Sequence, residues 1–189
     1  MKHIPLIICD LEATCWDTPA DREEMEIIEI GAVRIVEGEV LDSFHCMVRP
    51  IVHPQLSDFC RTLTTIKQYE VDQAALFPEV YQSFGKWLCQ SPEYVFSSWG
   101  RYDLRQLQLD VARHQLEWNP ELSNHLNLKH LFAQWRNVKP CGMERALQLV
   151  NLPLEGIHHR GLDDARNIAR LALLMLPWLL ESQQILKQE

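Results

Sequence analysis

The sequence lacks several features that would assign it to a specialised class of protein. Its six cysteines include no CxxC pair, so neither a disulfide framework nor zinc-finger spacing can be read from their positions. Long hydrophobic runs are absent as well: the apolar run at residues 4–9 ends at Asp10, too early for a secretory core or a membrane span. The strongest apolar stretch, residues 171–180, contains Pro177 and indicates a core helix. We therefore expect a cytoplasmic protein with reduced thiols and no membrane partner.

Basic residues are scarce. The chain has 18 Lys and Arg against 26 Asp and Glu, a net charge of −8. This balance argues against the broad phosphate-binding surface that gives nonspecific affinity for nucleic-acid duplexes. A nucleic-acid partner would have to be held locally, and some of the acids could serve a bound metal.

No linker, repeat or low-complexity segment interrupts the 189 residues, and their hydrophobic content of 47% is ordinary for a soluble globular protein. One domain, residues 1–189, with a sizeable core is expected. Strands come first and then alternate with helices, which indicates a mixed sheet covered by helices. The expected strands are 4–11, 26–36, 39–48 and 94–97, with a tight turn at 37–39 and a short strand or loop at 126–128; helices are expected within 54–90, ending in 78–88, and at 102–115, 129–136, 142–150 and from about 162.

Two carboxylates close the first expected strand. Asp10 and Glu12 follow the apolar run, and residues two apart on a strand point to the same face. Like charges held this close raise each other's pKa unless a cation lies between them, and a hard divalent metal suits oxygen ligands. A solvated strand end or a helix-capping group is the simpler interpretation of this pair taken alone.

Two further acids begin helices on the buried side. Asp164 is in register with the apolar stripe of the last helix, whereas Asp163 is in register with the polar Asn167 and Arg170. Asp163 is therefore the better candidate for capping or solvent exposure. Asp103 likewise precedes apolar positions on its own helix. The alternative role for Asp164 is to stabilise the N-terminus of its helix through the helix dipole. The alternative role for Asp103 is that of an N-cap.

His159 precedes Asp164 in a loop where Gly161 gives freedom to aim the imidazole. An imidazole titrates near neutral pH, so it can accept a proton as a general base. His158 is an immediate competitor for this role, and an exposed loop histidine is the ordinary alternative.

Four segments, in chain order, resemble the motifs of the DnaQ-like DEDDh exonucleases: ICDLEATCW, EIIEIGAV, SSWGRYDLRQL and HHRGLDDARNIARLA. The resemblance is strongest to the ERI-type subgroup, which contains the histone-mRNA 3′-end exonuclease and related regulators of RNA interference. Three intervening segments also look like that subgroup: PQLSDFCRTLTTIKQ, VDQAALFPEVYQSF and NLKHLF. The match covers nearly the whole chain, and the ordered set is specific although each piece is weak alone.

The resemblance implies a role for each matching position. Asp10, Glu12, Asp103 and Asp164 become the metal-site acids, with Glu12 also catalytic, and His159 becomes the general base. The implied contacts to the terminal nucleotide are Glu12, Ala13, Thr14, Tyr102 and His159. Tyr102 could stack on a base, whereas Trp16 and Trp99 are expected to pack in the core or the wall.

Two positions depart from the subgroup pattern. Thr65 stands where the subgroup often has glycine, and Arg101 where an acidic or small polar residue is common. Arg101 could alter the local field or contact a phosphate.

The implied fold is the ribonuclease H-like α/β sandwich, a five-stranded mixed sheet with helices on both sides. The implied activity of this single exonuclease domain is hydrolysis of single-stranded RNA, with DNA left open, from the 3′ end to nucleoside 5′-monophosphates. Two Mg²⁺ ions, for which Mn²⁺ could substitute, would activate water, and His159 would take its proton. The expected partners are single-stranded 3′ ends; any substrate selectivity must come from this domain or another protein.

Three alternatives stay open at this point: a DNA proofreading-type exonuclease, an oligoribonuclease-like enzyme, and a non-catalytic nucleic-acid-binding module. The four acids and the base together argue against the last, since a module without catalysis has no need of all five.

Overall fold

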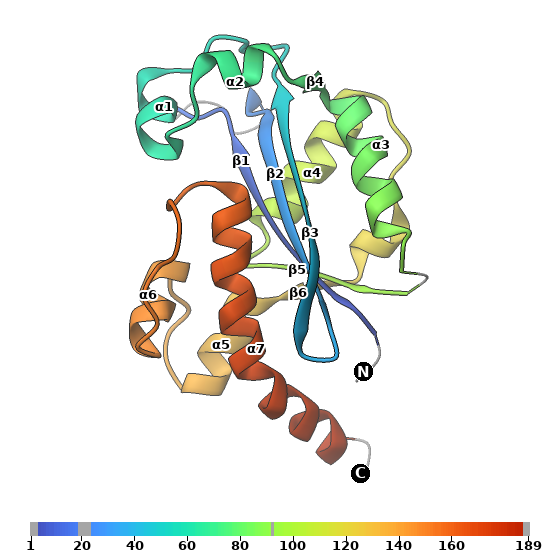
Figure 1. Ribbon diagram of the computed structural model, residues 1–189, viewed down its shortest axis with the longest axis vertical. Helices are drawn as coiled ribbons and strands as arrows, with labels where there is room; N and C mark the ends of the chain where they lie inside the picture. The colour runs from blue at the N-terminus through green and yellow to red at the C-terminus, as the bar shows by residue number, and fades with distance from the viewer. Residues whose placement is uncertain (1–3, 19–23, 92, 187–189) are drawn as a thin grey trace.

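The computed structural model describes residues 4–18, 24–91 and 93–186 (Figure 1). Its strands are β1 (Leu6–Ala13), β2 (Ile27–Val36), β3 (Glu39–Arg49), β4 (Ala75–Leu76), β5 (Val95–Ser98) and β6 (His125–Asn127). Its helices are α1 (Asp58–Thr64), α2 (Gln68–Asp72), α3 (Phe77–Leu88), α4 (Tyr102–Arg113), the 3₁₀ helix η2 (Pro120–Ser123), α5 (Leu128–Arg136), α6 (Met143–Leu149) and α7 (Gly161–Leu186). None of the described helices combines the length and apolarity needed to cross a membrane.

The strands form one mixed sheet in the order β4-β3-β2-β1-β5-β6. β1, β2 and β3 are antiparallel neighbours, and β5 runs parallel to β1. The predicted α/β mixed sheet is confirmed, but the predicted strand count of five is wrong. The sixth strand, β4, pairs only two residues with the end of β3 and interrupts the segment 54–90, where helical periodicity masks it.

The hairpin between β2 and β3 confirms the predicted tight turn. Glu37 and Gly38 both have positive φ, at 53° and 86°. Two consecutive residues with positive φ suit the right-handed twist of the flanking strands.

Helices cover both faces of the sheet. In Figure 1, α3 and α4 lie on one side, and α5, α6 and α7 lie on the other. Alternate residues of β1 separate the two layers: Ile7, Cys9 and Leu11 pack with α3 and α4, whereas Ile8 packs with α7. Asp10 and Glu12 continue the face of Ile8 and therefore look toward the layer that contains α7.

Two glycines allow α7 to begin in backbone contact with the sheet. A Cβ on Gly31 would lie 2.1 Å from the Gly161 carbonyl carbon and the Leu162 nitrogen, so no other residue fits there without a shift. A Cβ on Gly161 would lie 3.0 Å from the Asp10 carbonyl oxygen. This close approach brings the first turn of α7, with Asp164, directly over β1.

The backbone conformation at Thr65 explains why glycine suits this position. Thr65 ends α1 with a φ of 61°, in the left-handed region that costs a residue with a Cβ roughly 1–2 kcal/mol. Glycine at this position would avoid that cost, but the greater entropy of glycine in the unfolded chain would cancel part of the gain. We predict that Thr65→Gly raises the free energy of unfolding by about 0.5–1 kcal/mol, measured by urea denaturation.

The matched control is Thr62→Gly, at an exposed position inside the same helix. It should lower the free energy of unfolding by a few tenths of a kcal/mol, roughly 0.3, because glycine is a poorer helix former than threonine. Equal destabilisation by both substitutions would contradict the strain assigned to Thr65.

Candidate active site

A pocket of ≈ 530 Å³ opens where β1 ends, between the start of α4 and the turn before α7. The residues that line it come from six separate parts of the chain. They are Asp10, Leu11, Glu12, Ala13, Cys15, Met25, Leu63, Trp99, Tyr102, Asp103, Gly142, Met143, Glu144, Arg145, His158, His159 and Asp164. The structure thus brings the four predicted metal-site acids and the predicted base to one cavity.

Three of the acids are close enough to share a cation. Ligand oxygens of Asp10, Glu12 and Asp164 all lie within 4.8 Å of one another. Asp103 reaches the same pocket from the first turn of α4, and its Oδ1 accepts a hydrogen bond from the Leu11 N–H at 3.1 Å. That bond joins α4 to β1, so Asp103 does not act as the N-cap that was the alternative for it.

Burial raises the pKa of the acids. The pKa of Asp10 rises well above its ordinary value and that of Glu12 rises to about 9, and in both cases neighbouring carboxylates add to the effect of burial. Burial raises the pKa of Asp164 to about 6, although His158 and the His159 N–H oppose this. Burial also raises the pKa of Asp103, although the Leu11 N–H opposes this. Such a cluster can be fully ionised only beside compensating positive charge.

The donor set fits a divalent cation. Asp164 Oδ2 accepts the His159 N–H at 3.0 Å, but its Oδ1 is buried without a hydrogen-bond partner. A buried carboxylate oxygen of this kind needs a partner, and a hard cation supplies one. A second possible ligand group, His158, His159 and Asp164, mixes nitrogen and oxygen donors.

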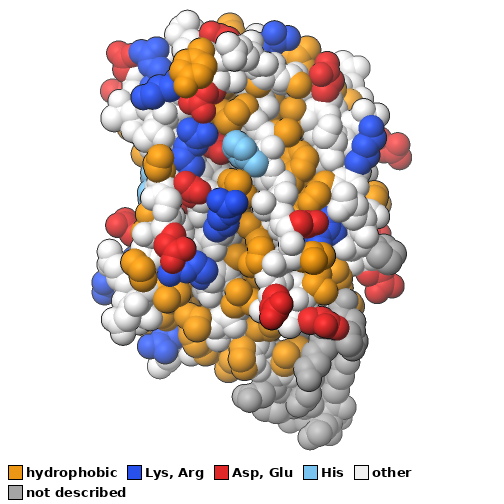
Figure 2. Space-filling view, viewed as in Figure 1, with side chains coloured by type: hydrophobic (Ala, Val, Ile, Leu, Met, Phe, Trp, Pro, Cys, Tyr) orange, Lys and Arg blue, Asp and Glu red, His pale blue; other side chains and the backbone are white. Residues whose placement is uncertain are grey.

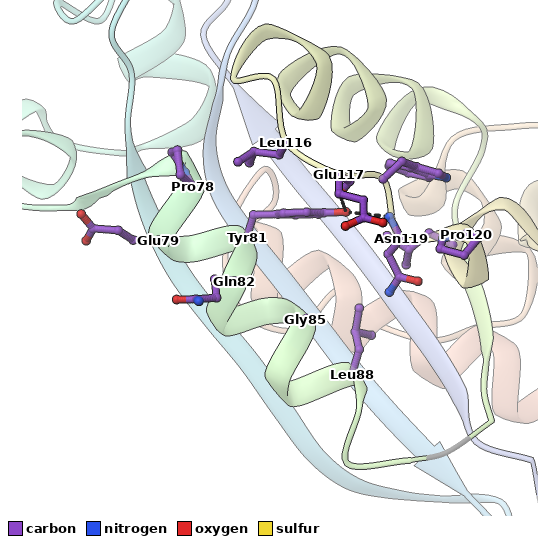
Figure 3. A pocket seen from close by; sticks show the side chains of 12 residues that line it. Pro78, Glu79, Tyr81, Gln82, Gly85, Leu88, Leu116, Glu117, Asn119 and Pro120 are labelled. Carbon is purple, nitrogen blue, oxygen red and sulfur yellow. Dashed lines mark hydrogen bonds between the residues drawn. The ribbon is translucent and has the colours of Figure 1, made fainter.

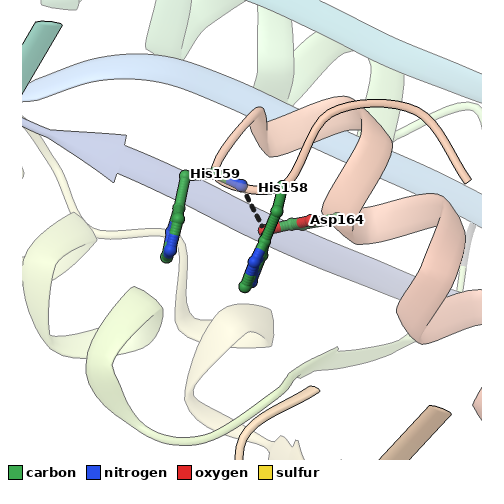
Figure 4. A group of neighbouring side chains, drawn as sticks. All are labelled: His158, His159 and Asp164. Atoms are coloured by element: carbon green, nitrogen blue, oxygen red, sulfur yellow. Dashed lines mark hydrogen bonds and ion pairs between the residues drawn. The ribbon is translucent and has the colours of Figure 1, made fainter. Parts of the chain in front are cut away.

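The two histidines lie side by side at the entrance to α7 (Figure 4). Their rings stack with centroids 3.9 Å apart, and His158 Nε2 lies 3.8 Å from Asp164 Oδ2. Burial lowers the pKa of His159, and the neighbouring His158 lowers it further. His159 therefore favours its neutral form, the form that can accept a proton.

Asp163 and Asp164 lie in different environments, as the apolar stripe of the last helix predicts. Asp164 is 4% exposed and lines the pocket. Asp163 instead accepts the Ile157 N–H at 2.9 Å and lies 3.7 Å from Arg166.

The predicted nucleotide contacts divide into two groups. Ala13 and Tyr102 line the pocket, with Trp99 as part of its wall. Thr14 does not: its buried hydroxyl accepts the Glu26 N–H at 2.9 Å, and its own N–H bonds the Glu26 carbonyl at 2.8 Å. These bonds hold the chain together beside the site, and the assignment of Thr14 as a substrate contact stays a prediction.

Two other candidates, Arg101 and Trp16, do not line the pocket. Arg101 is exposed at the start of α4, and Trp16 packs edge-on against His53, with ring centroids 4.8 Å apart. Trp99 donates from Nε1 to the Cys141 carbonyl at 3.0 Å and packs on Phe132, as expected for a wall residue.

Sequence reasoning missed Glu29. This carboxylate is 1% exposed on β2, directly opposite Glu12 in the strand register. Its Oε1 lies 2.8 Å from His45 Nε2 and its Oε2 3.3 Å from Arg160 Nε. The signal was present, because an acid inside an otherwise apolar strand is unusual and needs a partner.

A second, larger hollow of ≈ 730 Å³ lies between α3 and the segment 116–122 (Figure 3). Tyr81 spans it and accepts a hydrogen bond from the Asn119 N–H at 3.1 Å. Neither of the two groups of candidate metal ligands found among the described residues lies there. Both of these candidate ligand groups line the acidic pocket instead.

Comparison with known proteins agrees with this geometry. The family model RNase_T, described as Exonuclease, matches residues 7–172. The chain belongs to this exonuclease family.

Individual relatives refine the placement. Over 90% of its length the chain is 33% identical to mouse ERI1 exoribonuclease 2 and 32% identical to human 3′-5′ exoribonuclease 1. It spans only 28% and 52% of those two proteins, respectively.

Solved structures show the fold. The nuclease domain of 3′hExo, a DEDDh family member bound to rAMP, superposes with a TM-score of 0.88 at 30% identity, covering 93% of this chain and 92% of that one. A 3′-exonuclease studied for its recognition of the histone mRNA stem-loop gives a TM-score of 0.87 at 30% identity, covering 92% of this chain and 64% of that one. The predicted ribonuclease H-like architecture and the predicted subgroup are confirmed.

Proposed function

We propose that this protein hydrolyses single-stranded RNA from the 3′ end and releases nucleoside 5′-monophosphates. The observation that carries the proposal is the convergence of Asp10, Glu12, Asp103, Asp164 and His159 on one pocket. The names of the relatives, which include exoribonucleases, support the reaction class.

The acids are proposed to hold two Mg²⁺ ions, with Mn²⁺ as a substitute. Asp10, Glu12 and Asp164 offer oxygens that lie within 4.8 Å of one another, and Asp103 lines the same pocket from α4. Ions bound there would lower the pKa of water and neutralise charge on the scissile phosphate.

His159 is proposed to take the proton of the attacking water. His159 lines the same pocket as the acids, and its lowered pKa favours the neutral form that accepts a proton; both support this proposal. Asp103 is held by the Leu11 N–H, and Asp164 by the His159 N–H. These bonds fix two of the acids before substrate arrives, which avoids reorganisation during the reaction.

The pocket wall suits one terminal nucleotide. Ala13, Met25, Leu63, Trp99 and Tyr102 give apolar and aromatic surface beside the acids. Base stacking on such surface is worth roughly 1–3 kcal/mol and tolerates any sequence.

The wider surface supports local binding. Figure 2 shows acidic and basic side chains interspersed over the face drawn, and the net charge is −8. Few phosphates are therefore expected to be contacted, and affinity should depend on the 3′ end and on metal more than on salt.

Directional labelling tests the proposal. With Mg²⁺, 3′-labelled single-stranded RNA should release its label as a mononucleotide in the first turnover, whereas 5′-labelled RNA should shorten in a ladder. EDTA should stop both reactions, and single-stranded DNA and duplex RNA measured in parallel define the substrate class. Cleavage of circular RNA of the same sequence, which has no end, would contradict an exonuclease.

A further inference from the structure

Arg160 connects the turn before α7 to the sheet and to α2. Its Nε lies 3.3 Å from Glu29 Oε2, and its Nη2 lies 3.2 Å from Glu70 Oε1. Glu29 in turn lies 2.8 Å from His45 on β3 through its other oxygen. The Arg160 side chain is only 19% exposed, so solvent screens these ion pairs weakly.

The turn that Arg160 holds is conformationally unusual. His159 has a φ of 62°, and a non-glycine residue keeps such a conformation only where its surroundings impose it. Asp164 accepts the His159 N–H, and the Asp164 N–H donates to the Arg160 carbonyl at 2.8 Å. Those two hydrogen bonds stabilise the turn from within, and the Arg160 side chain connects the turn to β2 and α2.

The contact between Arg160 and Glu29 also affects the charge beside the metal-site acids. Glu29 lies opposite Glu12 in the strand register and is 1% exposed, so its charge lies buried beside the metal-site acids. His45 Nε2 and Arg160 Nε lie within ion-pair distance of its two oxygens, although Glu29 Oε2 is left without a hydrogen bond, so the Arg160 contact acts through charge. Without Arg160 the Glu29 carboxylate would keep His45 but lose its contact with a guanidinium, and its charge would be less compensated beside the four acids.

We propose that Arg160 is a positioning residue: by binding Glu29 and Glu70 it holds the turn that aims His159 and Asp164, and it neutralises a buried carboxylate next to the metal-site acids. This inference rests on the proposed function. Direct phosphate binding by Arg160 is the competing role, but the residue does not line the acidic pocket, whereas Arg145 does.

Steady-state kinetics of Arg160→Met, with Arg160→Lys as the conservative variant, tests the inference. Replacing a residue that orients a metal ligand typically lowers metal affinity or activity 10-fold to 100-fold. Arg160→Met should lower kcat by roughly that factor with KM within about twofold of the parent, and Arg160→Lys should lose less. Arg166→Met is the matched control, because Arg166 is more exposed and lies 3.7 Å from Asp163 rather than a buried acid; it should keep the parent kcat.

A second variant separates positioning from general destabilisation. Adding Glu29→Gln to Arg160→Met removes the charge that Arg160 no longer neutralises, so the double variant should bind Mn²⁺ less tightly than Arg160→Met alone, because one negative charge fewer attracts the cation; calorimetry without RNA measures this. Equal Mn²⁺ affinities in the two variants would overturn the neutralising role. A parent-level kcat in Arg160→Met, or a rise in KM alone, would overturn the positioning role.

The two proposals can fail separately. If the parent does not hydrolyse RNA, the proposed function fails, and the Mn²⁺ affinities together with a crystal structure of Arg160→Met still decide the inference. An unchanged turn at 157–160 and parent Mn²⁺ affinity would then overturn it. If Arg160→Met does not fold, Arg160→Lys decides: a severalfold fall in kcat at constant KM supports positioning, and a parent-level kcat overturns it.

Discussion

Asp10→Asn should abolish RNA hydrolysis and yet make the metal-free protein more stable. The activity should fall on the order of 10³-fold or more, because metal placement and charge stabilisation are lost together. The stability should rise because burial and the charges of Asp103, Glu12 and Asp164 all raise the Asp10 pKa, so its ionised form is unfavourable in the folded protein. Initial rates in Mg²⁺ and melting temperatures in EDTA measure the two effects.

The control for this experiment is Asp163→Asn. Asp163 is the immediate neighbour of Asp164 but points away from the pocket and accepts the Ile157 N–H, a bond that the amide oxygen of asparagine can keep. It should retain nearly all activity. A destabilised Asp10→Asn protein that still cleaves RNA would show that these acids have a structural role only.

His159→Asn should lower kcat by about 10²-fold to 10⁴-fold, the range that a positioned general base contributes. Asparagine suits this test better than alanine, since it tolerates the left-handed backbone that His159 adopts. The turn and the Asp164 contact should therefore persist, and Mn²⁺ affinity should change little. Single-turnover rates and calorimetric titration separate the chemical effect from metal binding.

His158 provides the matched comparison, because its ring stacks on His159 and lies near the same carboxylate. His158→Asn should act mainly on substrate affinity. If His158→Asn were the more damaging change to kcat, the turn would aim the other ring at the reacting water.

Local patterns predicted the parts of the site that depend on periodicity. Strand alternation placed Asp10 and Glu12 on one face, and the helical stripe distinguished buried Asp164 from Asp163. The role of each residue in catalysis stays a prediction, since geometry alone shows only that they meet.

What the sequence did not reveal depends on tertiary partners. β4 forms because Ala75 and Leu76 reach the end of β3, and two residues are too few to show a period. The Thr14 hydroxyl is occupied by the backbone of Glu26, across the strand pair. The Glu29–Arg160 contact joins residues far apart in the chain, so neither local composition nor spacing could pair them.

The most direct measurement of the central claim is anomalous diffraction from crystals soaked in Mn²⁺ with a nucleoside 5′-monophosphate. The account predicts two peaks about 4 Å apart, surrounded by oxygens of Asp10, Glu12, Asp103 and Asp164. Asp10→Asn crystals should lose at least one peak. A single peak held by His158, His159 and Asp164, with none beside Asp10 and Glu12, would contradict the account.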